Sequence, residues 1–357
     1  MYPKARRCLI LITSDWQVHD FKHFSETVNG ELTSRLQEAI SSIQFIGDYM
    51  AENNEKILVI LGDMFEIKGY VKVPVYNLVF NEILKLKKRG ISVYLMTGNH
   101  DQYDAGGLVH ALVPFKEIAK VYERLKLDVI EGITCVFVPY RKNKKQLAEE
   151  LHKVMGMDLP TDSILFLHQI LEGCQISDNY YAQREGLILP EGLKKKFKWI
   201  IAGDVHKPQH YENVWYCGSL FGRNFTDKFE QKSFLRYTGD TPEVIPNPKS
   251  PIFLKYIVKE QKDLDELQLE HTARIYIDVE CSKEMLPIVH NLLDRKENIR
   301  YLAHRIKEKI EVVQRGNVKL AMGTEEIIRN YVDYAGIGDA KLKELGVSIY
   351  AEATKKL

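Results

Sequence analysis

The sequence has few cysteines and no long hydrophobic run. Its five cysteines are spread over 357 residues without a close pair, which excludes a disulfide framework or a zinc knuckle and indicates a reducing compartment. No apolar run approaches the roughly 20 residues that cross a bilayer. The apolar run that ends at residue 12 is too short for a signal peptide and lacks a small-residue cleavage site. We therefore expect a cytoplasmic protein with no membrane partner.

The chain also lacks a dominant charge and a phosphate-binding glycine loop. Lys plus Arg number 50 and Asp plus Glu 49, so the net charge is +1. This balance excludes binding of nucleic acid by bulk charge but leaves room for a local basic groove. The absence of a G-x-x-x-x-G-K-[ST] segment excludes ATP hydrolysis of the P-loop type. With 45% hydrophobic residues, the chain can bury a core.

Short apolar runs that end in polar residues recur along the first two thirds of the chain. The runs have the length and branched side chains of buried strands, and they cover 8–12, 57–61, 91–96, 164–167 and 199–202. Apolar residues at helical spacing lie between them over 32–52 and 75–89. Alternating strands and helices predict a layered α/β domain. In such sheets ligands gather at the carboxyl ends of the strands, where the polar residues fall.

These strand-end residues include many side chains that can bind metal ions. Singly they are weak signals, because a Gly-Asp pair often forms a turn and a lone histidine is usually structural. The set as a whole is Asp15, Asp63, Asn99, His168, Asp204 and His206. Oxygen and imidazole donors that converge at one edge predict a site for two ions such as manganese. Two adjacent ions can generate a hydroxide and stabilise in-line displacement at phosphorus.

The same residues resemble the signature of a known family. The segments Gly62-Asp63, Gly98-Asn99-His100-Asp101, His168 and Gly203-Asp204-Val205-His206 are similar to that of the calcineurin-like metallophosphoesterases. The segments Lys207-Pro208-Gln209, Tyr216 to Leu220 and Arg223-Asn224-Phe225 resemble the H-x-P and Y-x-G-S stretch of the SbcD and Mre-eleven DNA-repair nucleases, including their phage relatives. The resemblance covers roughly residues 8 to 236. For a phage member, the compartment would be the host cytoplasm.

The resemblance implies a layered metallophosphoesterase fold, in which helices flank β-sheets, with a small α+β capping domain and C-terminal helices. A nuclease domain over 1–246 would precede a Pro-containing linker. A capping and DNA-binding domain would cover 252–316, with strands at 252–258 and 274–279, a helix at 284–293 and a charged stretch at 300–309. A helical partner-binding segment would cover 324–357.

The resemblance also implies a role for each site residue. One ion would be held by Asp15, Gln17, Asp63 and His206. The other would be held by Asp63, Asn99, His168 and Asp204. Asp63 would bridge the two ions, and His100 would serve the departing oxygen, so that Asp63 and His100 are the catalytic pair.

Two positions depart from the family pattern. The first cluster, usually D-x-H, is Asp15-Trp16-Gln17, and the last, usually G-H-x-H, carries Asp204 in place of the first histidine. An amide and a carboxylate in place of imidazoles make the donor set richer in oxygen, which favours Mn²⁺ or Mg²⁺ over Zn²⁺. Either Gln17 or the nearby His19 completes the first ion's ligands.

Basic residues near the predicted site are candidates for DNA contact. Arg141 and Lys142 follow a predicted strand, although a solvated helix start fits this segment equally well. Arg223 and Lys228 follow the Gly218-Ser219 turn, which the resemblance places beside the metals.

The family works with a coiled-coil ATPase of the SbcC type, as a homodimer within a heterotetramer. The resemblance places the docking site of this ATPase on C-terminal helices, here on two stripes formed by Ile327, Ile328 and Tyr331 and by Leu342 and Leu345. Periodicity alone favours packing of both stripes on their own domain.

We therefore expect a manganese-dependent DNA exonuclease and endonuclease that acts on DNA ends, single strands or hairpins in double-strand-break repair and recombination. The alternatives are another metallophosphoesterase, such as a protein phosphatase or a small-molecule phosphodiesterase, and a non-catalytic DNA-binding scaffold.

Overall fold

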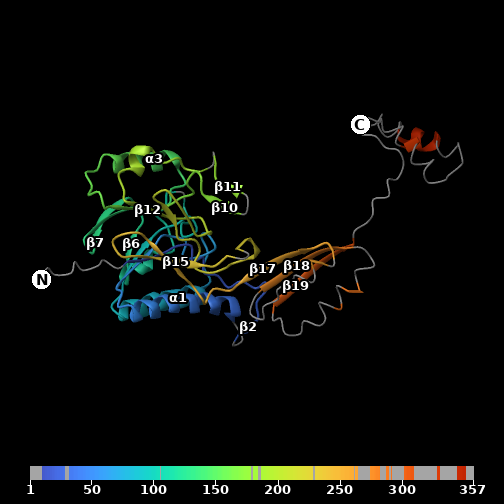
Figure 1. Ribbon diagram of the computed structural model, residues 1–357, viewed down its shortest axis with the longest axis horizontal. Coiled ribbons are helices and arrows are strands. Elements are labelled where there is room, and N and C mark those ends of the chain that lie inside the picture. The colour runs from blue at the N-terminus through green and yellow to red at the C-terminus, as the bar shows by residue number, and fades with distance from the viewer. Residues whose placement is uncertain are drawn as a thin grey trace.

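The computed structural model describes residues 10–260 with gaps at 29–31, 105, 178–179, 184–185 and 228–229. Farther along it describes 262–263, 274–281, 287–288, 291, 301–308, 328–329 and 344–350. Within these residues the predicted mixed α/β architecture is confirmed (Figure 1). No described helix is both long and apolar enough to span a membrane.

Two six-stranded sheets form the centre of the first part of the chain. The first has the order β16-β15-β1-β4-β5-β6, with bounds β1 (Ile10–Thr13), β4 (Ile57–Ile60), β5 (Ser92–Met96), β6 (Lys120–Tyr122), β15 (Ser233–Tyr237) and β16 (Glu243–Pro246). The second has the order β13-β14-β12-β9-β8-β7, with bounds β7 (Lys126–Ile130), β8 (Ile133–Val138), β9 (Ile164–His168), β12 (Trp199–Gly203), β13 (Gln209–Tyr211) and β14 (Val214–Tyr216).

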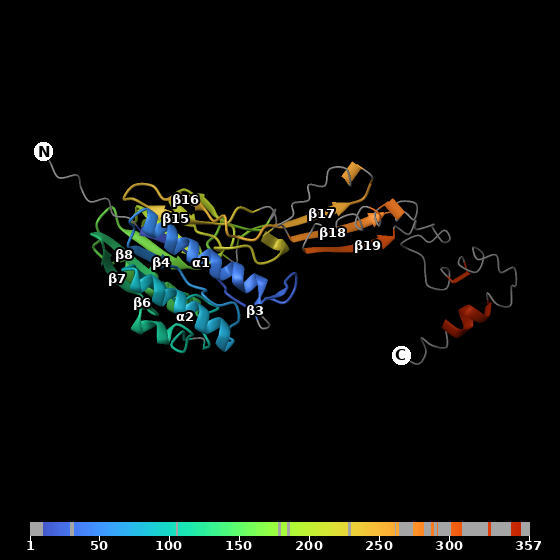
Figure 2. The same cartoon turned by 90° about the horizontal axis from the view of Figure 1, so that it is seen from below.

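Helices cover the outer faces of both sheets. They are α1 (Ser34–Glu52), α2 (Val73–Lys88), α3 (Lys144–Met155) and the short α4 (Glu191–Lys194). Figure 2 shows α1 and α2 side by side over the first sheet, and their apolar faces share one core with its outer face. The second sheet packs in the same way against α3 and α4. A third core, which contains Val59 and Phe166, joins the inner faces of the two sheets. The layers therefore run helix, sheet, sheet, helix.

Short elements connect these layers. They are β2 (Thr27–Val28), β3 (Leu32–Thr33), β10 (Gln175–Ser177), β11 (Tyr180–Tyr181) and the 3-10 helices η1 (Val113–Glu117) and η2 (Phe225–Asp227). Local sequence explains where the main helix α1 begins. The Thr33 hydroxyl accepts a hydrogen bond from the Leu36 N–H at 3.2 Å, as an N-cap residue does.

A separate sheet lies beyond the first part of the chain. It consists of three parallel strands, β17 (Phe253–Val258), β18 (Arg274–Cys281) and β19 (Tyr301–Glu308). β17 and β18 lie where strands are expected. β19 lies in the charged stretch at 300–309, for which no strand was expected. The expected helix over 284–293 falls almost wholly outside the described residues. The division into domains stays a prediction.

The strand directions bring the polar residues together. β1, β4 and β5 are mutually parallel, as are β9 and β12. The chain leaves the carboxyl ends of these five strands at Thr13, Ile60, Met96, His168 and Gly203. The backbone N–H of Asp204 lies 3.1 Å from the Asp15 carboxylate, so the carboxyl ends of the two sheets meet at one place.

Candidate metal centre

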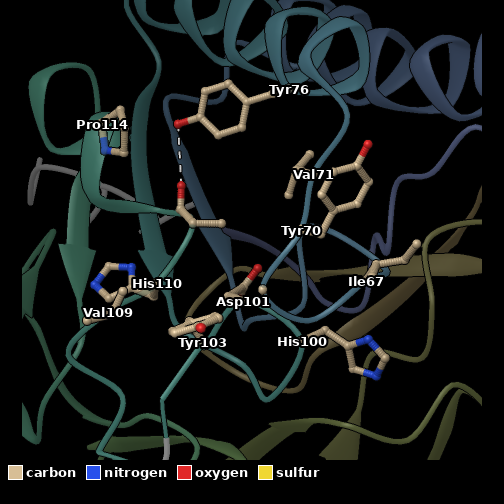
Figure 3. Close-up of a pocket in the computed structure, with 12 residues that line it drawn as sticks. Ile67, Tyr70, Val71, Tyr76, His100, Asp101, Tyr103, Val109, His110 and Pro114 are labelled. Carbon is tan, nitrogen blue, oxygen red and sulfur yellow. Dashed lines mark hydrogen bonds between the residues drawn. The ribbon is translucent and has the colours of Figure 1, made fainter.

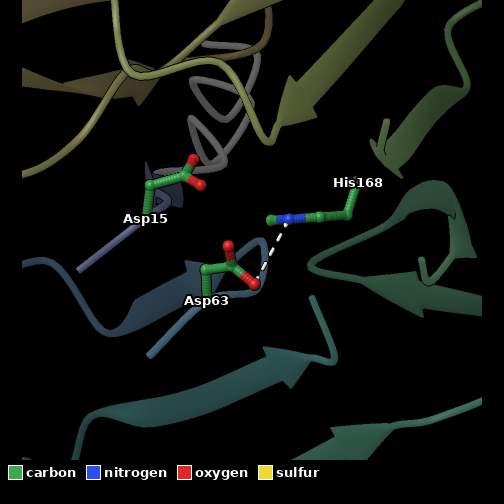
Figure 4. Close-up of side chains that lie close together, drawn as sticks. All are labelled: Asp15, Asp63 and His168. Carbon is green, nitrogen blue, oxygen red and sulfur yellow. Dashed lines mark ion pairs between the residues drawn. The ribbon is translucent and has the colours of Figure 1, made fainter. Parts of the chain in front are cut away.

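Three buried side chains lie at the centre of the site. A carboxylate oxygen of Asp15, one of Asp63 and a ring nitrogen of His168 all lie within 4.8 Å of one another. Figure 4 shows the two carboxylates from the first sheet converging on the imidazole from the second. Asp15, Asp63 and His168 are each 0% exposed. Two buried carboxylates this close together require compensation by cations or protons.

The loops that carry these side chains hold unusual backbone conformations. Asp15, Gln17, Asp63 and Asp204 have φ angles of 51°, 40°, 57° and 81°. The left-handed region costs a non-glycine residue on the order of 1–3 kcal/mol, and clusters of such residues mark functional sites. Backbone hydrogen bonds from Asp15 N to Gly62 O (3.0 Å) and from Gln17 N to Asp63 O (2.8 Å) hold the first two loops together. A Cβ on Gly98 would lie 2.1 Å from Asp63 Oδ1, so only glycine fits there.

His168 is oriented with one ring nitrogen toward the carboxylates. Its Nδ1–H donates to the Leu61 carbonyl oxygen at 2.5 Å. Nε2 therefore lies on the side of the carboxylates, 3.4 Å from Asp63 Oδ1 and 3.9 Å from Asp204 Oδ1. A second ring nitrogen fixed by a backbone carbonyl is the usual arrangement of a metal-binding histidine.

Three buried polar atoms at this site have no hydrogen-bond partner among the described residues. They are Gln17 Oε1, Asn99 Oδ1 and His168 Nε2. The NH₂ groups fix the orientation of both amides. Gln17 Nε2 donates to Asp63 Oδ2 at 2.9 Å, and Asn99 Nδ2 donates to Asp204 Oδ1 at 2.8 Å. Buried polar atoms without a partner are costly. Hard cations would satisfy these atoms, so the residues present fit a metal site.

The electrostatics of the site also fit cations. Burial and the neighbouring charge of Asp63 raise the pKa of Asp15 to about 7, and burial likewise raises the pKa of Asp204. Burial works against the charged form of His168, but the surrounding carboxylates outweigh it and raise its pKa well above the usual range. Divalent ions would compensate the carboxylate charges in place of protons.

His206 lies at the edge of the site on the side of Asp15. Its Nε2 is 3.8 Å from Asp15 Oδ1 and 3.2 Å from Gln17 Nε2. Burial and the positive charge of Arg223 lower its pKa to about 3, so the ring is neutral and can bind a metal ion. His19 instead packs edge-on against Phe21, with ring centroids 5.0 Å apart. The structure therefore places Gln17 rather than His19 beside Asp63.

His100 stands apart from the proposed ligands. Its Nδ1–H donates to the Glu66 carbonyl oxygen, and its Nε2 lies 4.0 Å from Asp63 Oδ2. The side chain is 27% exposed, in contrast to the buried ring of His168. An imidazole beside the carboxylates yet open to solvent can exchange protons with a substrate.

Asp101 is a site residue for which the sequence suggested no role. Its carboxylate accepts hydrogen bonds from the backbone N–H groups of Asp63 (2.8 Å), Met64 (3.0 Å) and Gly98 (2.9 Å). It therefore ties the loop after β4 to the loop after β5. The available signal was its position directly after the Gly-Asn-His segment.

Two predicted DNA-contact arginines have buried side chains engaged elsewhere. Arg141 is 3% exposed and donates to Glu150 Oε1 at 3.0 Å and to the Tyr140 and Glu123 carbonyl oxygens. Arg223 is 8% exposed, donates to Glu66 Oε2 at 2.8 Å and contacts the ring of His206. Both arginines therefore support neighbouring residues.

The remaining basic and apolar candidates are only partly described. Lys142 is exposed, whereas Lys228 lies outside the described residues. In the tail, Ile328 is half-buried and Leu345 is 52% exposed. Ile327, Tyr331 and Leu342 also lie outside the described residues.

A family model of the calcineurin-like phosphoesterases matches residues 9–237. The chain belongs to this family. Membership of this family implies a metal-dependent phosphoester hydrolase. The matched residues include every proposed metal ligand.

Two solved structures are similar to this phosphoesterase at low identity. A dimetal phosphatase from Danio rerio is 8% identical with a TM-score of 0.39, and the match covers 68% of this chain and 99% of that one. An archaeal phosphodiesterase is 10% identical with a TM-score of 0.32, over 67% of this chain and 99% of that one. No curated protein matches this phosphoesterase.

Proposed function

We propose that this phosphoesterase is a DNA nuclease of the SbcD and Mre-eleven type, with exonuclease and endonuclease activity. The observation that carries the proposal is the position of the segment that resembles those nucleases. Ser219 N–H donates to the His206 carbonyl oxygen at 3.0 Å, Ser219 pairs with Ser14 in an isolated bridge, and the side chain of Arg223 contacts His206. The nuclease-like segment thus packs directly on the proposed ligand loops.

The donor set supports manganese, with magnesium as the second choice. One ion is assigned to Asp15, Gln17, Asp63 and His206, and the other to Asp63, Asn99, His168 and Asp204. Carboxylate and amide oxygens outnumber imidazoles in this set, as hard or borderline ions prefer. The unpartnered oxygens of Gln17 and Asn99 are the atoms that such ions would satisfy.

The chain's own residues account for the chemistry around the ions. Two divalent ions held by these residues would supply an activated water and would neutralise charge on the phosphate. The Glu66 carbonyl fixes Nδ1–H of His100 and leaves Nε2 free, so that the imidazolium form of the ring can give its Nε2 proton to the departing oxygen and become the neutral imidazole. The Arg223 guanidinium contacts both the Glu66 carboxylate and the His206 ring. It therefore fixes the position of these two residues relative to each other.

A basic cavity beside Asp204 supports DNA as the substrate. The cavity has a volume of about 380 Å³, and its lining includes Tyr140, Lys142, Lys144 and Asp204. Lys142 and Lys144 are exposed and can pair with backbone phosphates. With Arg141 engaged by Glu150, we assign the phosphate contacts on this side to Lys142 and Lys144.

Substrate comparison tests this proposal. We expect the protein with Mn²⁺ to degrade linear and hairpin DNA much faster than it hydrolyses p-nitrophenyl phosphate, a phosphomonoester. The reverse order would favour a phosphatase. Failure to bind two ions or to cleave any phosphoester would favour a DNA-binding scaffold.

We also propose that the tail docks on an SbcC-type ATPase, within a cytoplasmic heterotetramer that contains two copies of this chain. Ile328 lies against the helix at 344–350, because a Cβ on Gly346 would be 3.2 Å from its Cγ2. Leu345 and Ile349 remain 52% and 60% exposed and can contact a partner. Deleting residues from Thr324 onward should keep nuclease activity and remove ATPase binding in a pull-down. Binding at full strength would contradict the docking role.

A further inference from the structure

A cavity with aromatic walls has His100 among its lining residues. Its volume is about 460 Å³, within the range of about 300–1,000 Å³ typical of small-ligand sites. Figure 3 shows Tyr70, Tyr76 and Tyr103 around it, with His100 at its edge. None of the described residues that line it is a lysine or an arginine.

The floor of this cavity is fixed by internal contacts. The Tyr76 hydroxyl donates to the Ala111 carbonyl oxygen at 3.3 Å, and its ring stacks on Phe65 with centroids 5.4 Å apart. His110 is held between the Glu123 carboxylate (2.8 Å) and the Leu112 N–H (3.2 Å). These contacts hold the side chains of Tyr76 and His110 in fixed positions.

The rim offers two aromatic rings to solvent. Tyr103 is 74% exposed and Tyr70 is 59% exposed. Tyr103 lies directly over the backbone of Gly69, where a Cβ would be 2.7 Å from the tyrosine Cδ2. Gly69 has a φ of +71°, so its missing side chain lets the ring lie against the loop. Exposed aromatic faces beside a phosphoester site are the usual stacking platform for unpaired bases.

We propose that this cavity holds the nucleobase of the nucleotide that carries the departing oxygen. The inference rests on the proposed nuclease function and names a subsite for it. His100 borders both the cavity and the metal centre, so a nucleotide whose oxygen accepts its proton has its base beside Tyr103. Aromatic walls that carry an aspartate but no lysine or arginine fit a planar base better than a phosphate. The base must leave its stack to enter, so the enzyme acts where the leaving nucleotide is unpaired.

Dinucleotides with one scissile bond test the subsite. One carries a thymine on the leaving sugar, and the other has an abasic sugar there. Because stacking is worth about 1–3 kcal/mol per base, wild-type kcat/KM should be about 5- to 150-fold higher for the first. Tyr103→Ala should abolish most of this preference, and Tyr103→Phe, which retains the ring, should keep it. Tyr70→Ala is the second variant and should also reduce the preference.

The control is Tyr181→Ala, which removes a tyrosine that is 52% exposed and lines neither cavity. It should retain the wild-type preference. Equal cleavage of both dinucleotides by the wild type, or full preference in Tyr103→Ala and Tyr70→Ala, would overturn the subsite. Loss of self-association in Tyr103→Ala with the preference intact would instead assign this surface to a second copy of the chain.

Hydrolysis of bis(p-nitrophenyl) phosphate, a diester without a base, separates the two proposals. If the wild type with Mn²⁺ hydrolyses this diester and DNA yet shows no base preference, only the subsite fails. If the wild type hydrolyses neither, the nuclease proposal fails and the subsite fails with it.

Discussion

The Asp101 carboxylate accepts a hydrogen bond from the backbone N–H of Asp63 at 2.8 Å. Asp63 is the proposed bridging ligand, and its φ of 57° lies in the left-handed region. Asp101 therefore positions Asp63 through the backbone of Asp63 and not through its side chain. Because the same carboxylate also accepts from Gly98 N–H, it holds two ligand loops at a fixed separation.

Replacing Asp101 with Asn should weaken metal binding and activity together. The amide can accept at only one atom, and its NH₂ group would face backbone N–H donors that need an acceptor. We expect a loss of about 10- to 100-fold in Mn²⁺ affinity, as for other groups that orient ligands. Titration calorimetry measures this directly. Wild-type affinity in Asp101→Asn would show that the backbone contacts do not matter for the site.

Gln17 should set the choice of metal. Its amide lies beside Asp63 and keeps one buried oxygen without a partner. Gln17→His replaces this oxygen with an imidazole and should shift preference from Mn²⁺ toward Zn²⁺, as should Asp204→His. Activity measured across a series of metal ions reports the shift. An unchanged order in both variants would mean that neither side chain is a ligand.

His100→Ala should slow turnover while both ions still bind. The ring touches the Glu66 carbonyl and lies 4.0 Å from Asp63, and no proposed ion depends on it. Loss of a proton donor costs typically 10²- to 10⁴-fold in rate. Single-turnover kinetics gives the rate, and calorimetry gives the number of ions. A variant that loses an ion would assign His100 to the metals instead.

Asp20 should make stability depend on pH. Burial tends to raise its pKa, but the Thr33 N–H and the Lys22 and Lys72 ammonium groups lower it to about 2. A lowered carboxyl pKa stabilises the fold above the unfolded value of about 4 and loses that contribution as pH falls toward 2. Asp20→Asn should therefore be less stable than wild type by about 1–2 kcal/mol at pH 5. Urea unfolding should show this difference shrinking toward pH 2, and a constant difference would contradict the assignment.

The sequence predicted the parts of the fold that depend on local pattern. The helices expected over 32–52 and 75–89 are α1 and α2 with shifts of two residues or fewer at each end. The strand ends also placed Asp15 and Asp63 together, because parallel strands share one carboxyl edge. β19 was missed as a strand because charged residues interrupt its apolar pattern.

Contacts between distant residues could not be predicted in the same way. Arg141 looked available for phosphate, but its partner Glu150 lies on α3, and a charge pattern does not show which charges pair. The backbone contacts of Asp101 depend on two loops that meet only in the folded chain. The residue types therefore indicated the chemistry of the site. The contacts that hold its residues in place could be found only in the structure.

The most direct test is Mn²⁺-dependent cleavage of linear and hairpin DNA by the wild type and by Asp63→Ala. Asp63 is the one carboxylate assigned to both ions, and its oxygens lie beside Gln17, His168 and His100. We expect the wild type to degrade DNA only with a divalent ion, and we expect Asp63→Ala to bind neither ion tightly and to leave the DNA intact. Full DNA cleavage by Asp63→Ala, or cleavage by the wild type in excess chelator, would contradict the two-metal site.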